Sequence, residues 1–149
     1  MSDMEQMNPK TSSARDLLRA EGYTCVFYGE HDLITERTRG VTPLLSLLDG
    51  GQSLGGFCAA DKVVGKAAAF LYVLLSVDEL FAEVISEPAK EVLSQYHIPY
   101  FAEKTVSAIR NRSGDGYCPM ESSVLDIQTP DEALTAIRKT LQALRARQS

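Results

Sequence analysis

The sequence lacks a surplus of positive charge and any long apolar run. Lys and Arg together number 15 against 20 Asp and Glu, so the formal net charge is −5. This excludes general nucleic-acid binding, because no basic surplus exists to displace counterions from phosphates. The longest apolar run, Ala67 to Val77, is shorter than the ~20 residues that span a bilayer. We therefore expect neither nucleic acid nor membrane among the partners.

Cysteine is also scarce, and the beginning of the chain lacks an apolar segment. The three cysteines, Cys25, Cys58 and Cys118, are an odd number without the spacing of a disulfide scaffold. Residues 1–12 are polar, unlike the apolar core of a secretory signal peptide. Both observations favour a reducing, cytoplasmic location.

The rest of the composition is typical of one soluble globular domain, with 44% apolar and 23% charged residues among 149. Residues 1–11 contain Asn8-Pro9 and no apolar period, which predicts a mobile tail. Residues 12–149 are then a single domain, long enough to bury a core.

Apolar periodicity and capping residues predict the order of elements in this domain. They indicate a helix, a two-stranded hairpin and then alternating helices and strands, at residues 12–21, 24–28, 33–36, 42–49, 55–60, 61–75, 80–85, 86–96, 100–102, 118–125 and 129–144. The period leaves open whether residues 105–109 extend a strand or form a helical turn. Alternation of this kind favours parallel strands joined by right-handed crossovers. The predicted fold is therefore an α/β, three-layer α-β-α sandwich with a mixed sheet.

The most unusual stretch is the predicted strand-to-helix junction at Asp61. Asp61 is a good N-cap for a helix whose first turn would contain Lys62, Gly65 and Lys66. The two lysines would be four residues apart on one face, where like charges repel at the positive end of the helix dipole. Gly65 would cost roughly 1 kcal/mol relative to Ala. Because such violations gather at functional sites, we predict that an anion binds this turn.

A plainer interpretation stays open, in which Asp61 only caps the helix and the lysines are solvated. Two further junctions carry polar residues, namely Arg39 before Gly40 and Ser86-Glu87 before a proline. Ligands in α/β folds bind where strands end and helices begin, so these residues could converge on the same site.

Cys118 is the candidate nucleophile. The sequence Cys118-Pro119-Met120-Glu121 resembles a capping box with Cys in place of Ser or Thr, which predicts a short helix. A helix N-terminus lowers the pKa of a thiol and favours the reactive thiolate. The alternative is a small residue that acts as a weak cap. Cys25 and Cys58 lie in apolar runs, and we expect them to be buried.

Several of these motifs together resemble a known family: Arg39-Gly40-Val41-Thr42-Pro43-Leu44-Leu45, Ala60-Asp61-Lys62-Val63-Val64-Gly65-Lys66-Ala67-Ala68, Ile85-Ser86-Glu87-Pro88-Ala89 and Cys118-Pro119-Met120-Glu121. Residues 17–141 are similar to the domain of unknown function 1893, a prokaryotic family whose fold is similar to cytidine deaminase. The resemblance implies a deaminase-like sheet and a ligand site in the deaminase position.

The resemblance does not extend to the zinc site of deaminases. Those enzymes hold zinc at two helix starts with His/Cys-x-Glu and Pro-Cys-x-x-Cys. By topology these starts correspond to Thr42-Pro43 and to residues 61–64, and the chain contains neither Cys-x-x-Cys nor His-x-Glu. Without three nitrogen or sulfur ligands the hydroxide-generating zinc is lost. We therefore expect no metal and no other cofactor, and the fold alone does not bring the activity.

The leading interpretation is a cytoplasmic, zinc-free domain that binds a small anionic molecule, such as a nucleotide or a phosphorylated metabolite. The candidate ligand-binding residues are Arg39, Asp61, Lys62, Gly65, Lys66, Ser86 and Glu87. If the protein is an enzyme, Cys118 is the candidate nucleophile and Asp61 or Glu121 the candidate acid or base. The alternatives are a sensing module without chemistry, and an interaction domain whose apolar helices form a homo-oligomer.

Overall fold

The computed structural model describes residues 6–110, 116 and 118–147. Along the chain the elements are α1 (Pro9–Glu21), β1 (Cys25–Tyr28), β2 (Leu33–Glu36), α2 (Thr42–Asp49), β3 (Cys58–Val64), α3 (Lys66–Leu75), β4 (Glu79–Ser86), α4 (Glu87–Gln95), β5 (Tyr100–Val106), α5 (Pro119–Ser123) and α6 (Pro130–Arg147). No helix in the described ranges is both long and apolar enough to cross a membrane.

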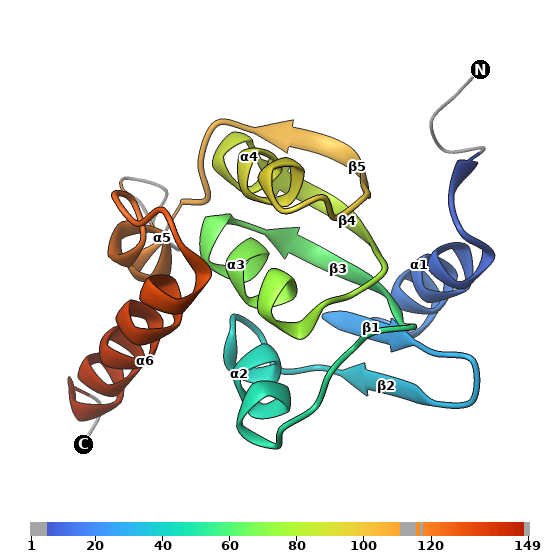
Figure 1. Cartoon of the computed structure of the whole chain (residues 1–149), viewed down its shortest axis with the longest axis horizontal. Helices are drawn as coiled ribbons and strands as arrows, with labels where there is room; N and C mark the ends of the chain where they lie inside the picture. Colours follow the sequence, from blue (N-terminus) through green and yellow to red (C-terminus); the bar gives the residue numbers. More distant parts are fainter. Residues whose placement is uncertain (1–5, 111–115, 117, 148–149) are drawn as a thin grey trace.

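The strands form one five-stranded mixed sheet in the order β2-β1-β3-β4-β5. β1 is antiparallel to both β2 and β3, whereas β3, β4 and β5 are parallel to one another. Helix α1 packs against β1, β3 and β4, while α3 packs with α2, α4 and α6 in the other helical layer (Figure 1). The predicted α/β class and mixed sheet are therefore confirmed, and the arrangement agrees with three layers.

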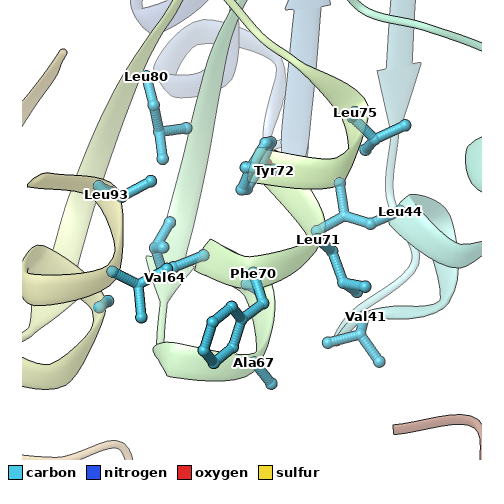
Figure 2. Close-up of a cluster of buried hydrophobic side chains, with 14 of the residues drawn as sticks. Val41, Leu44, Val64, Ala67, Phe70, Leu71, Tyr72, Leu75, Leu80 and Leu93 are labelled. Carbon is cyan, nitrogen blue, oxygen red and sulfur yellow. The ribbon is translucent and has the colours of Figure 1, made fainter. Parts of the chain in front are cut away.

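Helix α3 is the centre of the larger core. Its apolar side chains contact the sheet and the neighbouring helices, and Phe70, Leu71, Tyr72 and Leu75 are each at most 1% exposed (Figure 2). Burying a large apolar side chain stabilises a fold by about 1.5–3 kcal/mol. Packing on several sides fixes the position of α3, and with it the position of every group at the start of this helix.

The predicted tail at residues 1–11 is wrong from Met7 onward. Helix α1 begins at Pro9, and the side chain of Asn8 caps it by accepting a hydrogen bond from the amide of Lys10 at 2.9 Å. Met7 is only 7% exposed, and Thr11 is fully buried. Asn-Pro is a cap followed by the proline favoured at the first helical position. Residues 1–5 of the predicted tail lie outside the described ranges.

Two uncertain boundaries are decided by pairing between strands. β5 continues to Val106, because its residues pair with β4 as far as the register Ser86–Val106. β3 continues to Val64, where the sequence predicts a helix, because Val63 and Val64 pair with β4. The extended backbone makes these ladder hydrogen bonds, which a helix at the same residues would lose.

Candidate functional site

A cavity of about 650 Å³ lies where β3 ends and α3 begins. Distant segments of the chain line it: Gly22, Thr24 and Cys25, the β2–α2 loop from Arg37 to Val41, Asp61, Lys62, Val63, Gly65, Ala67, Ala68, Ile109, Arg110, Cys118, Met120 and Glu121. Ligand sites in α/β folds commonly occupy the ends of parallel strands. The cavity is therefore the natural place to look for a binding site.

The structure brings most of the predicted site residues together in this cavity. Arg39, Asp61, Lys62, Gly65, Cys118 and Glu121 all line it, although the sequence places them in three separate motifs. Lys66, Ser86 and Glu87 are not among the lining residues. The predicted convergence of three junctions therefore holds for two of them, together with the Cys118 motif.

The geometry predicted for the Asp61 turn is wrong. Asp61 and Lys62 lie within β3, Gly65 is the N-cap of α3, and Lys66 is the first helical residue. Lys62 and Lys66 therefore do not share a helical face, and Gly65 does not lie in a helix interior. The predicted charge conflict does not exist, because β3 keeps its pairing to Val64.

The first turn of α3 is capped by a carboxylate of the protein itself, that of Glu121. Glu121 on α5 accepts a hydrogen bond from the amide of Lys66 at 2.7 Å and another from the amide of Ala67 at 3.0 Å. Amides of the first helical turn have no hydrogen-bond partner within the helix, and the helix dipole also favours negative charge there. Burial raises the pKa of Glu121, and the two amides and the Lys66 charge oppose that rise.

Gly65 leaves the space that this carboxylate occupies. A Cβ atom on Gly65 would lie 2.8 Å from Oε2 of Glu121 and still closer to Oε1. The backbone of Gly65 is extended, with φ −97° and ψ −176°, so any residue could adopt it. Close approach of Glu121 is therefore the reason that glycine suits this position.

The predicted residues outside the cavity have structural contacts of their own. The ammonium group of Lys66 donates to the carbonyl of Leu125 at 2.9 Å. Ser86 is fully buried, and its hydroxyl caps α4 by accepting a hydrogen bond from the amide of Ala89 at 3.2 Å. Glu87 is exposed in the first turn of α4, where its charge suits the helix dipole. Capping accounts for Ser86 and Glu87.

Asp61 is hydrogen-bonded to the core while it lines the cavity. Its Oδ2 accepts a 2.6 Å hydrogen bond from the hydroxyl of Tyr72, and its Oδ1 accepts one from the amide of Val63 at 3.3 Å. Burial raises the pKa of Asp61 to about 6, although the Tyr72 hydroxyl and backbone amides partly oppose this. Burial and the charge of Asp61 raise the pKa of Tyr72. A carboxyl group that titrates near neutral pH in a cavity is a candidate proton acceptor.

The cysteines differ in their access to solvent. Cys118 is the N-cap of the five-residue helix α5, accepts no capping hydrogen bond through its sulfur, and is half-buried at the cavity. Cys25 and Cys58 are at most 4% exposed, which confirms their predicted burial. Burial is the main cause that raises the pKa of both buried thiols. Cys25 nevertheless lies on the cavity wall, opposite Asp61 in the β1–β3 pairing.

Two arginines of the lining were not among the predicted site residues. Arg37 donates from Nη1 to the carbonyl of Glu21 at 2.8 Å, and its guanidinium lies 4.5 Å from the centre of the Tyr23 ring. Arg110 follows β5 and also faces the cavity. The sequence Arg37-Thr38-Arg39 before Gly40 holds two positive charges within three residues, which is the signal that could have identified Arg37. Arg110 lies eight residues before Cys118, and a cation near the candidate nucleophile is the signal that could have identified it.

Metal ligands were also sought around the site. Within the ranges that the structure describes, no group of three or more His, Cys, Asp or Glu side chains is placed to hold a metal ion.

Comparisons with known proteins support the family that the motifs resemble. The model of the domain of unknown function DUF1893 matches residues 13–141. Among solved structures, a DUF1893 family protein (TM1506) from Thermotoga maritima is similar, with a TM-score of 0.81, 25% sequence identity and 92% of each chain covered. No curated protein matches the sequence. The relation to cytidine deaminases stays a prediction, since these comparisons do not test it. The chain belongs to the DUF1893 family, whose match extends from α1 to α6.

Proposed function

We propose that this protein binds a small anionic molecule, a nucleotide or a phosphorylated metabolite, in the cavity at the end of β3. The observation that carries the proposal is the charge of the lining, to which Arg37, Arg39, Lys62 and Arg110 contribute cationic side chains. They come from the β2–α2 loop, β3 and the segment after β5, so only the folded chain assembles them. A cleft whose lining has a surplus of positive charge concentrates anionic ligands.

The cations of the described lining outnumber its carboxylates, since Arg37, Arg39, Lys62 and Arg110 face only Asp61 and Glu121. Glu121 uses both oxygens on amides of α3, and Asp61 accepts hydrogen bonds from Tyr72 and Val63. In the described part of the chain, neither Arg39 nor Lys62 forms a salt bridge. A ligand anion would therefore be a partner for Arg39 and Lys62.

The size of the cavity also supports a small ligand. Its volume of about 650 Å³ lies within the range of about 300–1,000 Å³ typical of small-molecule sites. The first amides of α3 already bind Glu121, which supports a ligand anion against Arg39 and Lys62 and argues against one at the helix start.

The test is a thermal-shift and calorimetric screen with inorganic phosphate, nucleoside monophosphates and sugar phosphates. A ligand that binds only the folded state adds about 2.7 kcal/mol to the free energy of unfolding at a hundredfold excess over Kd. Arg39→Gln and Lys62→Gln should weaken binding. Lys66→Gln is the matched control, because it removes the same charge from a nearby residue outside the cavity lining.

The proposal fails if no phosphorylated compound stabilises the wild-type protein. It also fails if Lys66→Gln weakens binding as much as Lys62→Gln does, because the cations of the lining would then have no special role.

A Cys118-dependent enzyme acting on such a ligand is the second candidate. The specific observation is that Cys118 lines the same cavity as Asp61 and Glu121, so a nucleophile and two acid–base groups face one space. Rapid, ligand-protected alkylation of Cys118 would support it.

A further inference from the structure

Asp61 differs from the other carboxylate of the cavity in its exposure, since Glu121 is only 7% exposed whereas Asp61 is half-buried. Both oxygens of Glu121 are hydrogen-bonded to amides of α3. The hydroxyl of Tyr72 and the amide of Val63 each use one oxygen of Asp61. An ionised carboxylate has about four acceptor positions, so both groups retain acceptor capacity. That of Asp61 is the more accessible at the cavity wall, because Asp61 is the less buried of the two.

The Tyr72 hydrogen bond also fixes the orientation of the Asp61 carboxylate. Tyr72 is fully buried in α3 and packs in the core beside Leu71 and Leu75 (Figure 2). Asp61 is held in β3 by pairing with Cys25 on one side and Ala82 on the other. Backbone and side chain are therefore both positioned before a ligand arrives, and a positioned acceptor binds with less loss of conformational freedom.

We propose that Asp61 determines specificity by accepting a hydrogen bond from an N–H or O–H group of the ligand. The ligand would then carry two features, an anionic group for Arg39 and Lys62 and a nearby donor for Asp61. Sugar phosphates offer hydroxyl donors, and nucleotides offer hydroxyl and base amino donors. This inference rests on the proposed function and narrows its ligand class.

A carboxylate beside an anion site also selects against the wrong ligand. An anion without a donor gains nothing from Asp61 and is repelled by its charge, whereas a donor-bearing anion forms a charge-assisted hydrogen bond with it. Anions with a donor should therefore bind more tightly than anions without one, and this difference should depend on Asp61.

Ionisation of Asp61 makes the preference depend on pH. A protonated carboxyl accepts hydrogen bonds poorly, so affinity for donor-bearing ligands should fall as the pH decreases below about 6, where Asp61 takes up its proton. The charged and titratable groups around it are Tyr72 on α3, Cys25 on β1, Lys62 beside it on β3, and Arg37, Arg39, Arg110 and Glu121 across the cavity.

The experiment measures calorimetric affinities of the wild-type protein and variants for chosen probes. Ribose 5-phosphate and adenosine monophosphate bear donors, whereas sulfate and the phenyl phosphate dianion are anions without an N–H or O–H donor at neutral pH. At neutral pH, Asp61→Asn should weaken the donor-bearing probes about tenfold or more, as expected for a hydrogen bond to a charged group. It should leave the other two unchanged or slightly tighter. Asp32→Asn, in the exposed β1–β2 turn, is the control.

Tyr72→Phe is the second variant, and it keeps the carboxylate. As the pH is lowered, this variant should lose its affinity for the donor-bearing probes at a higher pH than the wild type does. The reason is that the Tyr72 hydroxyl favours the ionised form of Asp61. A comparison of the two donor-bearing probes shows whether the sugar or the base supplies the donor.

The outcomes separate the two proposals. If the donor-free probes bind as tightly as the others, or Asp61→Asn weakens all probes equally, Asp61 has no role in specificity while the anion site stands. If no probe binds the wild-type protein, the proposed function fails and this inference fails with it.

Discussion

The carboxylate of Glu121 lies in the space that a side chain at Gly65 would fill. It reaches from α5 to the first two amides of α3, at 2.7 Å and 3.0 Å, and crosses the position of the missing Cβ. The two residues act as one unit, since the glycine admits the carboxylate and the carboxylate caps the helix that the glycine precedes.

Gly65→Ala should lower the free energy of unfolding by about 1–3 kcal/mol, because the added methyl group overlaps Glu121. Urea denaturation measures the change. Gly55→Ala is the matched control, since a Cβ there would lie 3.5 Å from the hydroxyl of Ser53, an ordinary contact. Equal effects of the two substitutions would contradict the steric argument.

Glu121→Ala should also destabilise the protein, by about 1–3 kcal/mol, because it leaves the amides of Lys66 and Ala67 without their carboxylate. Glu121→Gln keeps one acceptor oxygen and should cost less. Glu91→Ala removes an exposed carboxylate from α4 and serves as the control in the same urea titration. If Glu121→Ala matches that control, the cap contributes nothing to stability.

Asp61→Asn should change how stability depends on pH. The pKa of Asp61 rises from 3.8 to about 6 on folding, so the folded protein keeps a proton that the unfolded chain releases. The stability that this group contributes is complete below about pH 4 and is lost as the pH rises through about 6. Asn does not ionise, so the variant should become more stable relative to the wild type over that interval. Urea denaturation at several pH values tests this. A difference in the free energy of unfolding between variant and wild type that does not change with pH would contradict it.

Iodoacetamide should label Cys118 before Cys25 and Cys58. Cys118 is half-buried at the cavity, whereas the other two are at most 4% exposed and burial raises the pKa of their thiols. Peptide mapping after limited treatment gives the order, and Cys118→Ser should remove the fast phase. An anion bound in the cavity should slow the labelling. Equal rates for all three thiols would show that Cys118 is only a structural cap.

The purified protein should hold no stoichiometric zinc and should not deaminate cytidine. The physical reason is the sequence itself, which contains neither Cys-x-x-Cys nor His-x-Glu to bind the metal. Elemental analysis and a cytidine assay, each with a zinc deaminase as positive control, are the measurements. One tightly held zinc per chain would overturn the prediction.

Local sequence determined the elements whose signals lie within a few residues. Ser86-Glu87-Pro88 marks the start of α4, and the Ser86 hydroxyl caps it by accepting from the amide three residues later. Thr129 caps α6 in the same way, by accepting from the amide of Glu132. Caps and apolar periods depend on neighbouring residues alone, so the mixed α/β order and most element positions follow from the sequence.

Tertiary structure decided the details of the site. Local propensity at Asp61–Lys66 favours a helix, but pairing of Val63 and Val64 with β4 keeps the backbone extended and moves the helix start to Lys66. The anion at that start comes from Glu121, 55 residues further along the chain, and the partner of Asp61 is Tyr72, across a strand and a helix. No spacing rule relates these residues, because the first contact forms only when α5 packs against α3, and the second only when α3 packs against β3.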